Sequence, residues 1–248
     1  MPIDLKAAIA PKAQVAAYPA LKASIVLFDC NPGTRSWTVP EGVSKIRAFV
    51  VGAGGASSSY ITGGGGGYSE RDISVTPGQV LSYTVGSGQT TTGGTSSFGG
   101  IISATGGSSG NGAPGGIGSG GSVNTSGGDG SGNGGGGGSG HAFGNGQKGS
   151  QMYGGGFSLD YRSFVDGWKI GLLPKESEYG FGGALVNIGG SPPVWLNCTT
   201  PGMGGGGCSN TSTTSNAAFG NAHGGIGGGG GAYVGKGGPG LVGIEVIA

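Results

Sequence analysis

Hydrophobic and polar residues alternate in several short stretches near the two ends of the chain, and this period of two predicts β-strands. In residues 37–55, Ile46, Ala48 and Val50 fall on one face of an extended chain, whereas Lys45 and Arg47 fall on the other. The same alternation recurs in three further sets: Ile73 and Val75; Leu81, Tyr83 and Val85; and Val242, Ile244 and Val246. Residues 24–29 (SIVLFD) form another short apolar run typical of a strand.

Proline followed by glycine marks the turns between these strands. Pro32-Gly33 follows the first strand, and Pro77-Gly78 lies between the two strands of residues 71–88. Such a dipeptide suits a tight turn, so residues 71–88 are predicted to form a hairpin-like reversal. The strand at residues 241–247 needs a partner, and the simplest arrangement is an antiparallel sheet that this C-terminal strand closes.

Glycine dominates the chain between these strands. The 248 residues include 67 Gly, whereas average usage is roughly 7%. Every third position from Gly94 to Ser139 is Gly, Ser or Asn. This period matches an extended left-handed helix with three residues per turn, in which a glycine edge lets a neighbouring helix approach closely. Residues 89–240 are therefore predicted to form packed polyglycine-II-type helices, with the five glycines 134–138 in an inner layer.

The predicted fold class is thus all-β with irregular parts, an antiparallel sheet joined to a polyglycine-II region. We expect an N-terminal attachment arm at residues 1–24, a sheet scaffold at 25–88 plus 241–248, and a glycine-rich region at 89–240. Collagen is a poor fit because only 12 residues are Pro. Disorder of the glycine region is the alternative, but charged residues make up only 9% and the aromatic content includes three Trp.

Residues 153–199 interrupt the glycine pattern with aromatic and charged side chains. One interpretation is a small additional hydrophobic core that holds the packed glycine-rich helices together. The other is a contact surface, because Tyr, Trp and Arg are enriched in binding hot spots. The candidate receptor-binding residues are Tyr153, Phe157, Tyr161, Arg162, Phe164, Trp168, Lys169, Tyr179, Phe181 and Trp195.

Charge and composition exclude several classes of function. A net charge of +1 argues against an electrostatic nucleic-acid binder. We find no apolar run of about 20 residues and no secretory signal, so we expect no membrane insertion and a cytoplasmic site of synthesis. The three cysteines suit a reducing compartment, and pairing of Cys198 with Cys208 is left open.

No catalytic constellation is visible, so we expect neither an enzyme nor a cofactor. The two histidines, His141 and His223, lie in separate glycine stretches, and no metal site is predicted. Pieces like GxGxxG recur, as any glycine-rich chain produces them, but none follows a strand and opens a helix.

Three segments resemble the glycine-rich domains of bacteriophage tail fibres and related virion proteins. They are WTVPEGVSKIRAFVVGAGG, GGGGGYSERDISVTPGQVLSYTVGSG and GKGGPGLVGIEVI, which together cover roughly residues 37–110 and 225–248. The matching features are Trp37 and Pro40 before a strand that runs into glycines, the Pro77-Gly78 turn, and the closing strand. The middle region also resembles the distal tail-fibre adhesins of T-even-type phages.

This resemblance implies a virion protein, a tail-fibre or tail-tip adhesin that binds a host surface protein or glycan through loops between glycine segments. The N-terminal arm would contact other virion proteins, and homo-oligomerisation is left open. A structural virion component without a receptor, such as a capsid decoration, neck or baseplate protein, is the alternative. An ice-binding protein is the third, although the charged aromatic insertion counts against it.

Overall fold

The computed structural model describes residues 24–57, 61–88, 91–132, 134–149, 155, 186–187, 195–196, 204–207, 224–231 and 235–247. In these residues every regular element is a β-strand, and all strand pairs are antiparallel, which confirms the predicted all-β class. The strands are β1 (Ser24–Asp29), β2 (Gly33–Thr38), β3 (Lys45–Val51), β4 (Thr62–Gly63), β5 (Tyr68–Ser74), β6 (Val80–Val85), β7 (Ser96–Phe98), β8 (Ile102–Ala104), β9 (Ser109–Gly110), β10 (Gly118–Ser119), β11 (Val123–Thr125), β12 (Val186–Asn187), β13 (Trp195–Leu196) and β14 (Leu241–Val246).

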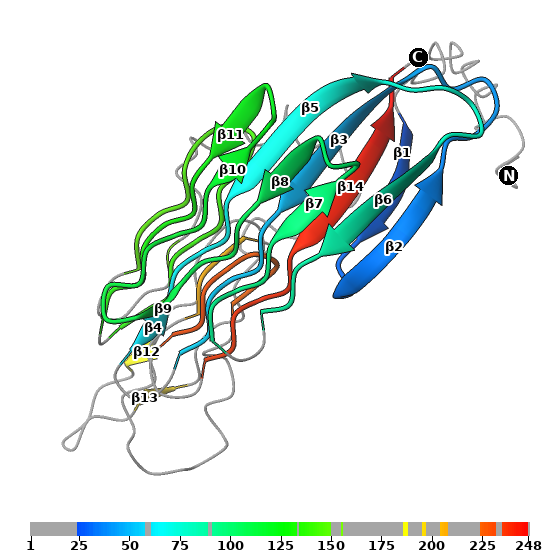
Figure 1. Ribbon diagram of the computed structural model, residues 1–248. Coiled ribbons are helices and arrows are strands. Elements are labelled where there is room, and N and C mark those ends of the chain that lie inside the picture. The colour runs from blue at the N-terminus through cyan, green and yellow to red at the C-terminus, as the bar shows by residue number, and fades with distance from the viewer. Residues whose placement is uncertain are drawn as a thin grey trace, which may run out of the picture.

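Two five-stranded sheets pack face to face at one end of the molecule (Figure 1). The first has the order β1-β14-β3-β5-β11, and the second has the order β10-β8-β7-β6-β2. Strand β14 is an inner strand that pairs with both β1 and β3, with Val242 opposite Val50 and Ser24 opposite Val246. Neither sheet closes into a barrel.

The hydrophobic core lies between these two sheets and follows the predicted alternation. Ile46, Ala48 and Val50 are fully buried, whereas Arg47 points outward and forms ion pairs with carboxylates on the outer face, including Asp72. The other predicted inward residues of β5, β6 and β14 are also buried or half-buried. The core also contains residues that the alternation analysis did not select: Val39, Val43, Phe98, Ile102 and Ala104.

The prediction of a hairpin in residues 71–88 is wrong, although the predicted turn at Pro77-Gly78 is present. Gln79 N–H donates to the Thr76 carbonyl at 3.0 Å, and Gly78 has a φ of 80°, as a type II turn requires. However, β5 belongs to the first sheet and β6 to the second, so the chain crosses between the sheets at Pro77-Gly78. Both strands still direct their buried apolar side chains into the same core, but they do so from opposite sheets.

The three-residue frame from Gly94 to Ser139 does not have a single conformation either. Strands β7, β8, β10 and β11 lie within it and belong to the sandwich. Between β7 and β8 the chain reverses at Gly99 and Gly100, whose φ values of 61° and 67° suit a type I′ turn. Phe98 and Ile102 pair directly across this turn and are buried, so packing of large side chains overrides the small-residue period there.

Candidate functional site: the glycine array

Strands of the sandwich continue as extended glycine-rich segments that run side by side towards the opposite end of the molecule (Figure 1). We call these segments the glycine array: residues 52–57, 62–67, 91–94, 105–108, 113–117, 126–132, 134–140, 145–149, 204–207, 224–231 and 235–240. Residues 52–57 and 62–67 precede the region in which the sequence predicted such packing. The short strands β4, β9, β12 and β13 lie at the end of the array away from the sandwich (Figure 1).

Hydrogen bonds in the array rotate among neighbours with a period of three. In residues 52–57, three successive N–H groups donate to three different segments and the fourth N–H returns to the first segment, at N···O distances of 2.7–3.0 Å. A β-strand would alternate between two sides instead. Gly52 donates to Gly67 and Gly55 to Gly64, both in segment 62–67. Ala53 donates to Gly94 and Ala56 to Thr91, both in segment 91–94. Gly54 donates to Gly238 and Ser57 to Gly235, both in segment 235–240.

Residues 63–67 lie inside the array and satisfy both backbone groups of every glycine. Their N–H groups donate to residues 224–231, 105–108 and 126–132 in rotation. Their carbonyls accept from three other segments, also in rotation, namely 134–140, 52–57 and 113–117. Buried backbone groups without partners would each cost about 1–3 kcal/mol, so this complete pairing stabilises a slab that has no apolar core of its own.

Close approach of backbones is the reason for glycine at most of these positions. A Cβ atom added at Gly65 would lie 1.9 Å from the Gly138 carbonyl oxygen, and one at Gly54 would lie 1.9 Å from that of Gly228. Neither glycine has a φ in the left-handed region, so its freedom at positive φ is not used there. Space between segments, rather than backbone strain, excludes side chains from the inner positions.

The glycines at 134–138 are all buried, as the sequence predicted. Gly136 N–H donates to the Gly207 carbonyl at 2.8 Å, and its own carbonyl accepts from Gly155 N–H at 2.7 Å. A Cβ atom at Gly136 would lie 2.1 Å from the Gly229 oxygen. These neighbours come from distant parts of the chain, so this glycine run is a structural segment and not a linker.

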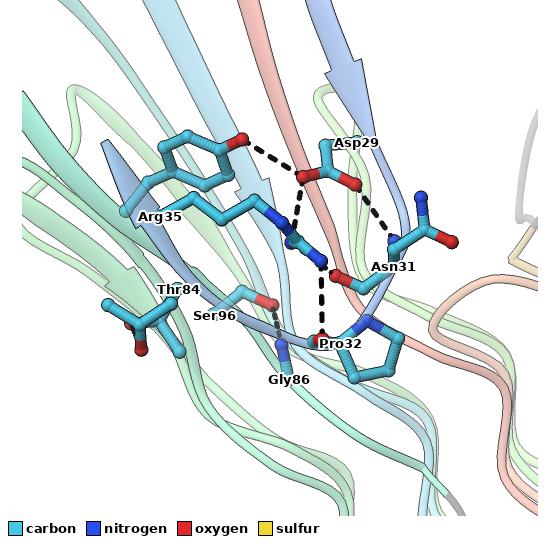
Figure 2. A network of polar contacts seen from close by, with 9 residues as sticks. Asp29, Asn31, Pro32, Arg35, Thr84, Gly86 and Ser96 are labelled. Carbon is cyan, nitrogen blue, oxygen red and sulfur yellow. Dashed lines mark hydrogen bonds and ion pairs between the residues drawn. The ribbon is translucent and has the colours of Figure 1, made fainter. Parts of the chain in front are cut away.

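A polar cluster fixes the crossover between β1 and β2 where the sandwich meets the array (Figure 2). The buried Asp29 carboxylate accepts from Arg35 Nη1 at 2.9 Å, from the Tyr83 hydroxyl at 3.0 Å and from Asn31 N–H at 2.9 Å. Burial raises the pKa of the Asp29 carboxyl, but these hydrogen bonds and the Arg35 charge outweigh it and hold the pKa below its ordinary value. Close by, Ser96 Oγ accepts from Gly86 N–H at 3.0 Å.

His141 is buried at the turn that follows residues 134–140. Its Nδ1 accepts a hydrogen bond from Phe143 N–H at 3.3 Å, and burial lowers the pKa of the imidazole to about 4. The ring is therefore neutral at physiological pH and packs as a structural side chain.

No cluster of three or more His, Cys, Asp and Glu side chains able to hold a metal occurs in the part of the chain that the structure describes. Nor do those residues include a helix that is long and apolar enough to cross a membrane. Cys30 is a half-buried free thiol, whereas Cys198, Cys208 and His223 lie outside the described residues.

The predicted receptor-binding residues lie almost entirely outside the described residues. Only Trp195 is placed, by its backbone, in β13, where it pairs with Asn187 of β12. Both strands lie at the end of the array away from the sandwich (Figure 1). The remaining candidates lie outside the described ranges: Tyr153, Phe157, Tyr161, Arg162, Phe164, Trp168, Lys169, Tyr179 and Phe181.

The described part of the chain is thus a β-sandwich whose strands extend into a glycine array. A family model described as a glycine-rich domain matches residues 29–247, and the chain belongs to this glycine-rich domain family. No curated protein is similar enough to this chain to count as a relative.

Proposed function

We propose that the protein is a bacteriophage virion protein, a tail-fibre or tail-tip adhesin that binds the host cell surface. The observation that supports this most is the polarity of the molecule. Ser24 and Val246 lie opposite each other in the sandwich, whereas the array extends from the sandwich towards the end where β12 and β13 lie (Figure 1). Such a molecule can be held at one end and present the other.

The N-terminal arm, residues 1–24, is the part that we assign to attachment. It contains Lys6, Lys12 and Lys22 but no glycine, and a segment of this composition can order when it docks on another virion protein. Deletion of this arm should leave a folded protein that is missing from assembled particles. Incorporation of the truncated protein would place attachment elsewhere.

The glycine array supplies the rigid body of the adhesin in this proposal. We interpret its segments as polyglycine-II-type helices, because their hydrogen bonds rotate among three neighbours with a period of three residues. An experimental structure in which residues 52–57 and 62–67 have φ and ψ near −75° and +145° would support this. Ordinary strand dihedrals with two-sided pairing would refute it.

Host recognition is assigned to residues 153–199. The inner array offers mainly Gly, Ser and Thr, which provide little apolar contact area, whereas strong binding needs a few large anchors. Tyr161, Trp168 and Trp195 are the available anchors, and Arg162 and Lys169 can complement an acidic surface. The receptor would be a surface protein or a glycan, and the proposal requires no catalysis.

Adsorption of virions to host cells tests this assignment. Trp168→Ala should weaken binding by roughly 2 kcal/mol, about thirtyfold in affinity, with an unchanged melting temperature. Phe143→Ala is the matched control, because Phe143 is an aromatic residue in the turn after residues 134–140 that is 44% exposed and lies outside the insertion. Unchanged adsorption with a lowered melting temperature for Trp168→Ala would indicate an additional hydrophobic core instead.

A structural virion component without a receptor is the second candidate. The self-sufficient hydrogen bonding of residues 63–67 favours it, because a stiff array is useful as a spacer in a neck, baseplate or capsid decoration. Particles that assemble without this protein and still adsorb normally would support this candidate over the adhesin.

A further inference from the structure

Residues 113–117 and 126–129 belong to neighbouring segments of the glycine array that expose Pro114, Ile117 and Asp129, and we call this exposed side the outer face. The segment 113–117 exchanges backbone hydrogen bonds with residues 62–67, 105–108 and 126–132. Gly116 N–H donates inward to the Gly65 carbonyl at 2.8 Å. In a three-fold segment successive N–H groups point about 120° apart, so the N–H groups of the neighbours Gly115 and Ile117 point away from that inner segment.

Side chains, rather than backbone carbonyls, accept these outward N–H groups. Asp129 Oδ1 accepts from Gly115 N–H at 3.1 Å, and Thr105 Oγ1 accepts from Ile117 N–H at 2.8 Å. One segment further along the same face, Asn145 Oδ1 accepts from Ser126 N–H at 2.9 Å. Thr105, Asp129 and Asn145 come from three different segments and are all exposed.

Proline removes a further donor from this face. Pro114 is three residues before Ile117 and therefore points in the same direction in a three-residue period, but it has no N–H. It is exposed, and its carbonyl accepts from Ser108 N–H at 3.0 Å. At Pro114, Gly115, Ile117 and Ser126 this face therefore offers no free backbone N–H.

An exposed row of free backbone donors in such an array is equivalent to the unpaired edge of a β-sheet, which recruits further strands. The glycine segments of a second copy would provide carbonyls at the matching three-residue spacing. We propose that Thr105, Asp129 and Asn145, together with Pro114, protect these four positions of the face from lateral pairing with a second copy of the chain.

The test compares two multiple variants of the full chain at increasing protein concentration. Thr105→Val, Asp129→Ala and Asn145→Ala together remove all three acceptors. The control, Thr105→Ser with Asp129→Asn, retains every acceptor oxygen and changes the net charge by the same one unit. We expect the acceptor-removing variant to reach about twice the mass of the control by light scattering or sedimentation. Equal masses for the two variants, with the fold retained, would overturn the proposal.

Pro114→Ala provides a second variant, which adds a donor and removes no contact side chain. It should raise the mass at high concentration, and more strongly when combined with Thr105→Val. If the triple variant does not fold and Pro114→Ala with Thr105→Val keeps the wild-type mass at every concentration, the proposal is also wrong.

Discussion

Replacing Gly65 by Ala tests whether close approach of backbones holds the array together. The new Cβ would lie 1.9 Å from the Gly138 carbonyl oxygen, whereas carbon contacts normally begin near about 3.5 Å. Residues 134–140 would therefore have to move away by roughly 1.5 Å. This movement would break the hydrogen bonds from Gly137 to Gly63 and from Gly140 to Gly66, both 2.9 Å long.

The expected cost follows from those two bonds. Each of the two buried N–H groups left without an acceptor costs about 1–3 kcal/mol, so the loss from the donors alone is roughly 2–6 kcal/mol. Replacing Gly by Ala restricts the unfolded chain and returns about 0.4–1 kcal/mol, which leaves a net destabilisation of at least roughly 1–6 kcal/mol. For a chain of this length each kcal/mol lowers the melting temperature by about 2–4 °C.

Thermal unfolding followed by circular dichroism or calorimetry measures this effect. Gly112→Asn is the matched control, because a Cβ there meets nothing within 4 Å, and Asn tolerates its φ of +65°. The control should melt within about 2 °C of the wild type. A Gly65→Ala protein that melts as the wild type does would refute the close-packing argument.

Three further outcomes follow from the same structure. Gly136→Val should abolish soluble folded protein, as judged by expression and gel filtration, because its Cβ would lie 2.1 Å from the Gly229 oxygen; normal melting of the variant would contradict this. Tyr83→Phe should lower the free energy of unfolding in urea by roughly 2 kcal/mol, because the charged Asp29 carboxylate loses the hydrogen bond from the Tyr83 hydroxyl. Thr34→Val, which removes an exposed hydrogen bond to Thr84, should leave it nearly unchanged. The pKa of His141 is lowered from 6.5 to about 4, so the unfolded chain binds the proton more tightly and stability should fall as pH drops from 6.5 towards 4, by roughly 3 kcal/mol at most. His141→Gln should lose this pH dependence, and an equal slope in both proteins would exclude His141 as its source.

The sandwich strands were largely predictable because apolar residues alternate with polar ones along each strand, and this alternation indicates which side chains are buried. Ile46, Ala48 and Val50 alternate with charged residues, and the structure buries them as a set. The partner of each strand could not be read in the same way. The turn at Pro77-Gly78 has the same local geometry whether it joins strands of one sheet or of two. The strands that each one pairs with decide between them: β5 lies between β3 and β11, whereas β6 lies between β7 and β2.

The glycine array was predictable in kind but not in extent. A period of three is visible only where it is not interrupted, and residues 52–57 and 62–67 are too short to show it. Their role depends on segments far away in the sequence, such as residues 224–231 and 235–240. Conversely, Gly100 continues the small-residue pattern but forms a turn between strands together with Gly99. Composition does not distinguish glycine needed for space from glycine needed for positive φ.

The array and the sandwich depend on each other for a thermodynamic reason. Glycine loses more conformational entropy on folding than any other residue, and the array buries few apolar side chains to offset that loss. The sandwich reduces the cost because it fixes where segments begin: residues 52–57 follow β3, residues 62–67 lead into β5, and residues 235–240 lead into β14. These three segments adjoin in the array through hydrogen bonds from Gly52 to Gly67 and from Gly54 to Gly238, just as β14, β3 and β5 adjoin in the first sheet. The register of the sheet is thus carried into the array, and the hydrophobic core of one end orders a glycine-rich body that has no such core.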